Sequence, residues 1–224
     1  MKIGVVYTST TPELIELVER ELKKNVGEEA QFVSFQDPSI LAEVRDSGYV
    51  TPTATARLVG LYTDAINAAA DVILNCCSSV GEVADSVQDM GKFTGIPIVR
   101  IDEEMCREAV RQGKRIGVMA TLTSTLSPTK STILRVAREM NKQVELVDAL
   151  LEGAFGLSQD EFKARMLAKA QEIADNVDVI LFAQGSMAYC EEIIHDACGK
   201  LVVSSPRFGA YAIKKALEAK GLLK

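Results

Sequence analysis

The stretch DVILNCCSS (Asp71–Ser79) occurs a second time, little changed, as DVILFAQGS (Asp178–Ser186). Each copy has an aspartate, an apolar run and a polar turn, which is the pattern of a strand in a parallel sheet that is covered on both faces. If the stretches are copies of one unit, Cys77 and Gln184 occupy the same place in each. The repeat therefore predicts the fold, and it raises the question of why one copy has a thiol and the other an amide.

The repeat extends beyond these two stretches. KIGVVYTST from Lys2 aligns with RIGVMATLT from Arg115, and IPIVRID after the first copy has a looser counterpart, KLVVSSP, after the second. Apolar strands resemble one another by chance, but these matches occur in the same order in both halves. The order predicts two α/β halves of about 105 to 110 residues each.

Short runs rich in Val, Ile and Leu alternate with longer amphipathic stretches along the chain. This alternation predicts βα units, and hence an α/β protein with two pseudo-symmetric, doubly wound parallel-sheet (αβα) domains. The segment 36–48 is expected to be a loop. The expected strands are residues 2–7, 31–35, 72–76, 96–100, 115–120, 144–147, 179–183 and 201–204, and the expected helices are residues 12–24, 53–69, 101–112, 127–140, 158–176 and 206–219.

Polar side chains gather where the predicted strands end, and ligands of an open parallel sheet bind beyond those ends. Hydroxyl-rich turns and helix N-termini hold a carboxylate without a metal, so we expect a small acid as the ligand. Each hydroxyl can equally be a helix N-cap. If the halves face each other about a pseudo-dyad, Cys77 and Gln184 lie opposite one another across an active-site cleft. The candidates are Thr8, Ser9, Thr10, Cys77, Ser78 and Ser79 in the first half and Thr121, Thr123, Ser124, Thr125, Gln184, Gly185 and Ser186 in the second.

Cys77 is the candidate base, proton donor or nucleophile. At the junction of a strand and a helix, the helix dipole is expected to favour its thiolate form. Its neighbour Cys76 must point to the other side of the strand, so only one of the two thiols faces the ligand. The alternative is that Cys77 is an inert side chain of the core. The polar turn that follows it favours the first interpretation.

Four other polar residues have a structural alternative to a place in the site. Glu82 either reaches the ligand or stabilises the first turn of its own helix. Arg57 either joins a carboxylate pocket or forms a surface salt bridge, and Lys130 either contacts a substrate anion or is solvated. His195 lies in the predicted helix CEEIIHDAC and is expected to be structural.

The composition narrows the classes of function. A net charge of −6 and a pI of about 5.0, from interspersed acids and bases, argue against nucleic acid or an anionic membrane as a partner. Five cysteines without a CxxC pair and a single histidine predict neither disulfides nor a metal site. Neither GxGxxG nor GxxxxGKS/T occurs, so no nucleotide cofactor is indicated. The start, MKIGVVYTST, has no long apolar run, and we expect a soluble, cytoplasmic protein.

The chain resembles the aspartate/glutamate/hydantoin racemase superfamily over its whole length, in the two DVIL strands, the Cys77-Ser78-Ser79 turn and the segment GVMATLTST. The resemblance implies two pseudo-symmetric α/β domains with the chain end returning to the first. Here these are residues 1–98 with 206–224, and residues 99–205. It also implies a cofactor-independent reaction in which one cysteine ends a strand in each half, as Cys-Asn-Thr in the first and Gly-Cys-Thr in the second.

This sequence follows the family pattern in its first half and departs from it in the second. Cys77-Ser78-Ser79 matches the first motif with two Ser replacements, whereas AQGS at 183–186 has Gln184 where the second cysteine belongs. The pair Ala120-Thr121, with Ser124 or Thr125 behind it, resembles the family's substrate-carboxylate segment. The hydroxyls of Thr8, Ser9 and Thr10 stand where the family has polar ligands near the N-terminus.

The glutamine is incompatible with ordinary two-base racemisation, because an amide neither removes nor delivers a proton. It can still donate a hydrogen bond to a carboxylate or a developing enolate. We therefore expect a cofactor-independent isomerase or racemase-like enzyme in which Cys77 alone transfers a proton next to the carbonyl of a small carboxylic acid. True racemisation would need water or another residue, such as Tyr49 or Glu82, on the second face. The alternatives are a decarboxylase or other lyase, and a catalytically silent carboxylate-binding protein; a homo-oligomer is expected in each case.

Overall fold

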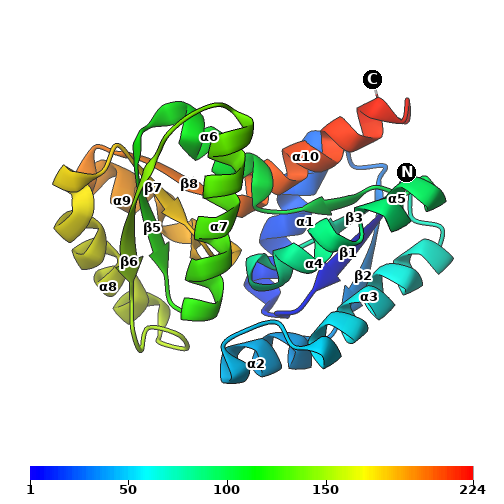
Figure 1. Ribbon diagram of the computed structural model, residues 1–224, viewed down its shortest axis with the longest axis horizontal. Helices are drawn as coiled ribbons and strands as arrows, with labels where there is room; N and C mark the ends of the chain where they lie inside the picture. Colours follow the sequence, from blue (N-terminus) through cyan, green and yellow to red (C-terminus); the bar gives the residue numbers. More distant parts are fainter. Residues whose placement is uncertain (224) are drawn as a thin grey trace. The chain divides into compact units, whose positions relative to one another are not determined.

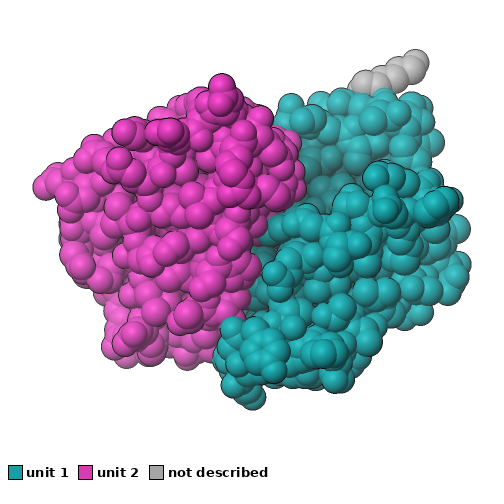
Figure 2. Space-filling view, viewed as in Figure 1, with its two compact units in different colours: residues 1–101, 206–224 teal, residues 102–205 magenta. Residues whose placement is uncertain are grey.

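The structure is a computed structural model that describes residues 1–223. The chain forms two compact units, coloured separately in Figure 2: unit 1 is Met1–Ile101 with Pro206–Lys224, and unit 2 is Asp102–Ser205. Each unit has one four-stranded sheet of parallel strands, so the predicted α/β class with two parallel-sheet domains is confirmed. The first boundary follows Ile101 and not residue 98, because Ile101 packs in the core of unit 1 with Ala210 and Ile213.

Unit 1 is a parallel sheet with helices on both faces (Figure 1). Its elements are β1 (Lys2–Tyr7), α1 (Pro12–Val26), β2 (Gln31–Gln36), α2 (Pro38–Ser47), α3 (Pro52–Asn67), β3 (Val72–Asn75), η1 (Ser78–Val80), α4 (Gly81–Ser86), α5 (Gln88–Thr94), β4 (Ile98–Arg100) and α10 (Ser205–Ala219). The strand order is β2-β1-β3-β4. Alternate side chains of β3 enter different cores: Val72 and Leu74 pack with α1 and α10, and Ile73 packs with α2, α3 and α4. This alternation produces the three layers.

Unit 2 has the same plan. Its elements are α6 (Glu103–Gln112), β5 (Arg115–Ala120), α7 (Thr123–Glu139), β6 (Glu145–Leu150), α8 (Gln159–Ile173), η2 (Ala174–Asn176), β7 (Val179–Phe182), η3 (Gly185–Cys190), α9 (Glu191–Cys198) and β8 (Leu201–Ser204). The strand order is β6-β5-β7-β8. Met119, Ile180 and Phe182 pack with α8 and α9 on one face, whereas α6 and α7 lie side by side and cover the other (Figure 1).

The repeat indicated by the sequence is present in the strand pairing. Ile3 of β1 pairs with Val72 of β3, and Ile116 of β5 pairs with Val179 of β7. These are the residues that the two sequence alignments place at equivalent positions. The internal repeat is therefore a repeat of backbone register and not a chance likeness of apolar runs.

The aspartate that begins each DVIL copy has a structural role. Lys2 N donates to Asp71 Oδ2 at 2.8 Å, and Arg115 N donates to Asp178 Oδ2 at 2.8 Å. Each carboxylate thus takes a backbone N–H at the start of the neighbouring strand, which would otherwise lack a partner in the ladder. The shared Asp fixes the register at the amino end of each strand pair.

The glycine shared by KIGVV and RIGVM is explained by close packing. A Cβ added to Gly4 would lie 3.1 Å from Ala65 Cβ, and a Cβ added to Gly117 would lie 2.7 Å from Ile173 Cδ1. In both units a helix packs so closely on the central strand that a larger side chain would have to displace its neighbours.

The prediction of a loop at 36–48 is wrong, because this segment contains α2. Asp37 is its N-cap and accepts a hydrogen bond from Ser39 N at 3.0 Å, and Pro38 occupies the first turn. Ile40 and Val44, one turn apart, bury the inner face of the helix. An Asp-Pro start is a recognised helix signal. The short helices α4 and α5 are likewise absent from the prediction.

The start of α7 also differs from the prediction in a way that affects the site. The helix begins at Thr123 and not at Ser127, and Pro128 lies inside it. Residues 123–125 are therefore the first turn of a helix and not a turn that precedes one. The positive end of α7 lies directly after β5.

Candidate active site

The first site lies beyond the ends of β1 and β3, which are neighbours in the sheet of unit 1. Cys76 N still donates to Val6 O at 2.9 Å, so Cys77 is the first residue past the strand pairing. Ser9 and Thr10, which come after β1, are half-buried. We define the cysteine site as the buried residues at these two strand ends, Thr8, Cys77, Ser78 and Ser79.

The two adjacent thiols point to opposite faces of the sheet, as predicted. Cys76 packs in the core formed with α1 and α10, whereas Cys77 packs in the core that contains Tyr62 of α3 and Val80. Cys77 is therefore the thiol on the α3 side, next to the η1 turn.

The acidity of Cys77 differs from the prediction. Burial raises the pKa of the Cys77 thiol above its ordinary value. The Thr8 hydroxyl, the backbone N–H groups of Ser79 and Val80 and the Ser79 hydroxyl oppose this change without cancelling it. The expected stabilisation of the thiolate by a helix dipole is too weak here, because α4 has only six residues and the thiol is shielded from water. Cys77 is therefore a protonated thiol at neutral pH, within reach of groups that would stabilise its thiolate.

Thr8 has an unused hydrogen-bonding group. Its side chain is 1% exposed, and among residues 1–223 no well-formed hydrogen bond reaches its Oγ1. The hydroxyl is nevertheless close enough to Cys77 to lower the pKa of the thiol. A buried hydroxyl without a well-formed hydrogen bond is rare in folded proteins and calls for an explanation. A hydrogen bond to a bound ligand would provide one.

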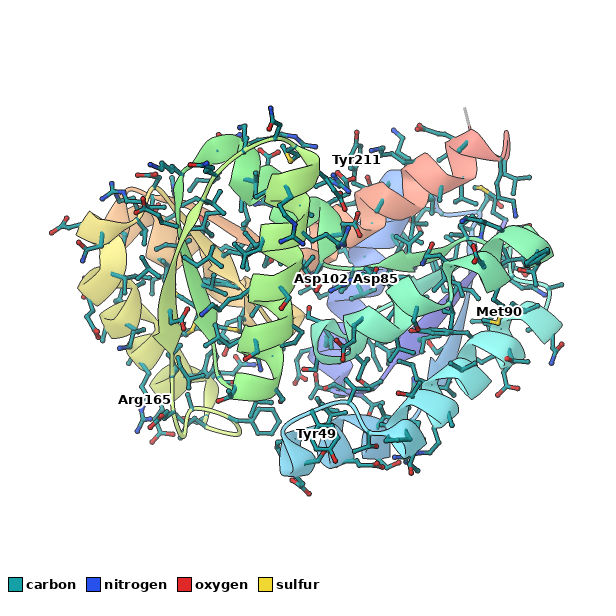
Figure 3. All side chains as sticks on the ribbon, in the orientation of Figure 1. Tyr49, Asp85, Met90, Asp102, Arg165 and Tyr211 are labelled. Atoms are coloured by element: carbon teal, nitrogen blue, oxygen red, sulfur yellow. The ribbon has the colours of Figure 1, made fainter. Side chains whose placement is uncertain are left out.

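Arg100, at the end of β4, is a buried cation that was not predicted. Its side chain is 4% exposed, and Nη1 lies 2.5 Å from Oδ2 of Asp85 on α4, which Figure 3 labels. A Cβ on Gly81 would overlap the guanidinium group, so a larger residue where α4 begins would displace Arg100 from its present position. Arg100 thus supports the turn that follows Cys77. Its sequence context, the end of an apolar run, gave no sign of this role.

The second site lies beyond the ends of β5 and β7 in unit 2. Ala183 N donates to Met119 O at 2.9 Å, so Gln184 is the first residue past the pairing and is structurally equivalent to Cys77. We define the glutamine site as Thr121, Ser124, Thr125 and Gln184.

The Gln184 amide is bound to Thr121. Its Oε1 accepts a hydrogen bond from Thr121 N at 2.8 Å, and its Nε2 donates to Thr121 Oγ1 at 2.7 Å. The amide therefore bridges the ends of β5 and β7 and is held in one orientation. Gln184 and Thr121, which are both predicted to hold the ligand, thus also bind each other: this contact uses one of the two Nε2 hydrogens and leaves the second.

The start of α7 offers hydrogen-bond donors next to this amide. The N-cap residue Leu122 provides no side-chain cap, and the first turn contains no acidic residue. Ser124 is 8% exposed, and its buried Oγ has no hydrogen-bond partner among the described residues. Thr125 is also buried. An uncapped helix N-terminus with an unpartnered hydroxyl is suited to a carboxylate.

Several other candidates are occupied elsewhere. Arg57 forms ion pairs with Asp37 and Glu43 in unit 1, so the salt-bridge alternative holds for it. Lys130 forms an ion pair with Asp148 at 2.7 Å. These cations are held by acids of their own unit.

The remaining candidates are at the surface. Tyr49, labelled in Figure 3 between α2 and α3, is 64% exposed, and Glu82 is an exposed acid in the first turn of α4. His195 is exposed, with Nδ1 2.7 Å from Lys200 O. Gly185 is half-buried and Ser186 is exposed on η3. Neither Tyr49 nor Glu82 is therefore part of the buried cysteine site.

Residues 1–223 contain no group of three or more His, Cys, Asp and Glu side chains arranged to hold a metal ion. In the same residues, no helix has the length and apolar character that crossing a membrane requires.

The fold is similar to those of known racemases and isomerases. Allantoin racemase from Pseudomonas fluorescens is 18% identical, with a TM-score of 0.64 over 100% of this chain and 93% of that chain. Glutamate racemase from Bacillus anthracis is 15% identical, with a TM-score of 0.72 over 99% of this chain and 83% of that chain. Maleate isomerase from Pseudomonas putida S16 is 15% identical, with a TM-score of 0.55 over 97% of this chain and 93% of that chain. At these identities the likeness is one of fold.

The sequence comparisons confirm the resemblance to a family. No curated protein sequence matches the chain. The sequence profile of the Asp/Glu/Hydantoin racemase family matches residues 3–213, a range that contains both strand repeats and both sites. The chain belongs to the Asp/Glu/Hydantoin racemase family.

Proposed function

We propose that this protein is a cofactor-independent isomerase or racemase-like enzyme in which Cys77 transfers a proton at the carbon next to the carbonyl of a small carboxylic acid. The observation that carries the proposal is the buried Cys77 thiol at the start of the η1 turn, where the Thr8 and Ser79 hydroxyls and the Ser79 and Val80 N–H groups oppose the rise in its pKa that burial causes. A core cysteine without a chemical role has no use for such a set of donors.

The environment of Cys77 suits a proton donor that becomes a base. Burial raises the pKa of the Cys77 thiol and so keeps the proton on sulfur in the resting protein. The thiolate left after proton donation is stabilised by Ser79 and Val80 N–H, and by the hydroxyls of Thr8 and Ser79. A thiol of raised pKa is also a stronger base once it is ionised, as removal of a proton from a carbon acid requires.

We propose that the glutamine site binds the carboxylate of the substrate. The N-terminus of α7 and the unpartnered Ser124 hydroxyl favour an anion. The second Nε2 hydrogen of Gln184 is a donor for a carboxylate or enolate oxygen, since Thr121 fixes the orientation of the amide. Neither the Ser124 hydroxyl nor the Gln184 amide can ionise, so the glutamine site assists binding and not proton transfer.

One alternative reaction is favoured by the protonated state of Cys77. In a decarboxylase, loss of CO₂ leaves a carbanion that needs a single proton on one face, and a protonated thiol supplies it. The same observation suits a catalytically silent carboxylate-binding protein, which needs no base. These alternatives differ in what happens to the acid, so one screen separates them.

The screen is proton NMR in deuterated water with a panel of small acids. The names of the structural relatives suggest the first members: both enantiomers of glutamate and aspartate, allantoin and maleate. A Cys-to-Ala variant of the maleate isomerase has been solved with maleate. Hydantoins, malonates, and hydroxy and keto acids complete the panel. We expect deuterium uptake or conversion of at least one member by the wild-type protein and none by Cys77→Ala. Binding without turnover would replace the enzyme proposal by the binding protein.

A further inference from the structure

Asn75 is the one polar side chain within β3, and it lies in a fully buried strand. It is 1% exposed, in a run that is otherwise Val72, Ile73 and Leu74. A buried amide costs free energy unless both of its ends are hydrogen-bonded. The position therefore calls for specific partners.

Both ends of the Asn75 amide are occupied. Tyr62 Oη, from α3, donates to Asn75 Oδ1 at 3.1 Å, and Asn75 Nδ2 donates to the backbone oxygen of Cys77 at 3.0 Å. All three residues are buried, and Tyr62 is fully inaccessible. The chain of bonds leads from a core helix to the peptide group that follows the thiol.

The Cys77 carbonyl belongs to the peptide plane from which the η1 turn starts. The N–H groups of Ser79 and Val80, within the η1 turn, are the backbone donors that stabilise the thiolate of Cys77. Holding the carbonyl fixes the peptide plane from which the turn that carries those N–H groups begins. Cys77 is extended, with φ −132° and ψ 116°, in a broad allowed region, so a hydrogen bond to its carbonyl narrows the orientation of this plane.

The repeat provides an internal comparison. The residue of β7 equivalent to Asn75 is Phe182, which is packed in the apolar core of unit 2. In the copy with Cys77, the residue two positions earlier in the strand is Asn75. In the copy with Gln184, that residue is Phe182. A general need of the fold for a polar group at this place would apply to both copies.

We infer that Asn75, supported by Tyr62, is a positioning residue for Cys77: it fixes the peptide plane after the thiol so that the Ser79 and Val80 N–H groups face sulfur. The relevance of this role to catalysis rests on the proposed function. The role itself concerns the thiol alone and is measured without a substrate.

The test is the rate of Cys77 alkylation by iodoacetamide as a function of pH. Peptide mass spectrometry with fragment ions distinguishes Cys77 from Cys76. The variants are Tyr62→Phe, which removes one hydroxyl, and Asn75→Leu, which removes both hydrogen bonds. Tyr7→Phe is the matched control, because Tyr7 is a fully buried tyrosine of the same unit whose hydroxyl has no hydrogen-bond partner among residues 1–223.

We expect the midpoint of the alkylation profile to rise by about one pH unit in Asn75→Leu and by about half a unit in Tyr62→Phe, because the thiolate loses well-directed donors. Tyr7→Phe should leave the midpoint unchanged. Where the screen yields a substrate, kcat should fall about tenfold in Asn75→Leu with KM within about twofold.

Two results would overturn the inference. A purely structural role predicts a loosened core, with faster alkylation at every pH because the thiol becomes more accessible. Profiles of Tyr62→Phe and wild type that superimpose would also exclude the role, and this variant answers the question even if Asn75→Leu does not fold. An inactive protein whose thiol profile shifts as expected would contradict the proposed function alone.

Discussion

The residues that follow β3 and β7 share a backbone framework and differ in chemistry. Both strands pair in the same register with the neighbouring strand, and both follow an Asp that binds a backbone N–H at the start of that neighbour. Beyond β3 lies a buried thiol whose pKa burial raises and nearby donors lower, and beyond β7 lies a half-buried amide bound to Thr121. The first residue past the ladder makes no strand hydrogen bonds, so its identity can change without loss of register. A repeat can therefore keep its fold while its two halves take different chemical roles.

The greatest difference is expected between the two adjacent thiols, Cys77 in the cysteine site and Cys76 on the other face of the sheet. Cys77→Ser should lower kcat about 10³-fold, because a serine hydroxyl is a far weaker acid than a thiol and forms almost no base at neutral pH. KM should stay within about threefold, since binding is assigned to the glutamine site. Steady-state kinetics on the acid found in the screen would measure both.

Cys76→Ser is the matched control. Cys76 points into the core formed with α1 and α10, so its replacement should reduce thermal stability and leave kcat within about threefold of wild type. Equal losses of kcat in the two variants would mean that Cys77 acts through packing and not through proton transfer.

The next effect tests whether the glutamine site binds a carboxylate. Gln184→Glu keeps an acceptor for Thr121 N but replaces the amide donor by a negative charge, which repels an anionic substrate. We expect KM to rise about 30-fold with kcat within about threefold. Gln143→Glu adds the same charge at an exposed position of unit 2 and should change neither constant. A fall in kcat with an unchanged KM would assign Gln184 to the chemical step instead.

A smaller effect compares two buried hydroxyls on α7. Ser124 and Thr129 both lack a hydrogen-bond partner among the described residues, but only Ser124 lies in the first turn of the helix. Ser124→Ala should raise KM about tenfold, because a hydrogen bond to a charged ligand is lost. Thr129→Val should leave KM unchanged and raise the melting temperature slightly. If the two variants have the same KM, the unpartnered Ser124 hydroxyl does not bind the ligand.

The smallest effect concerns the aspartates that define the repeat. Hydrogen bonds from Arg115 N, from the Arg115 side chain and from Lys114 N lower the pKa of Asp178 to about 2, from an ordinary value of 3.8. The stability that ionised Asp178 contributes is present above about pH 4 and is lost as the pH falls through about 2. Asp178→Asn should therefore lower the melting temperature by about 2 to 4 °C at pH 7 and by progressively less toward pH 2.

Within residues 1–223, the Asp71 carboxylate accepts one such bond, from Lys2 N, so Asp71→Asn should have the smaller effect at pH 7. Thermal unfolding followed by circular dichroism between pH 2 and pH 7 measures both variants. An Asp178→Asn difference that does not change with pH would show that the carboxylate acts through its shape and not through its charge.

The strands and their order along the chain were predictable because a buried parallel strand has a short apolar signature, and because the repeat supplied it twice. The α2 helix lies where a loop is expected, although Asp37 and Pro38 form a recognised helix start. The start of α7 was expected at residue 127 because Pro128 is more typical of a first turn than of a helix interior, whereas the helix begins at Thr123.

The positions of the candidate residues were predictable, and their contacts were not. Strand ends identify which residues lie close together, so the places of Thr8 and Cys77 in unit 1 and of Thr121 and Gln184 in unit 2 follow from the sequence, while their role as a site stays a prediction. The bond between Gln184 and Thr121 depends on the adjacency of β5 and β7 and on the side-chain rotamer, neither of which one sequence provides. The raised pKa of Cys77 has the same origin, because burial is a property of the folded environment and outweighs a local helix dipole.

The stereochemical course of proton transfer tests most directly whether Cys77 does the chemistry and Gln184 the binding. A single enantiomer of the acid found in the screen, or its prochiral precursor, is turned over in deuterated water, and chiral analysis with NMR locates the deuterium. With Cys77 as the only proton-transfer group, we predict deuterium on one face, at a rate that Cys77→Ala abolishes and Gln184→Glu reduces only at low substrate concentration. Deuterium on both faces at comparable rates, or exchange that persists in Cys77→Ala, would contradict the assignment of chemistry to the cysteine site and of binding to the glutamine site.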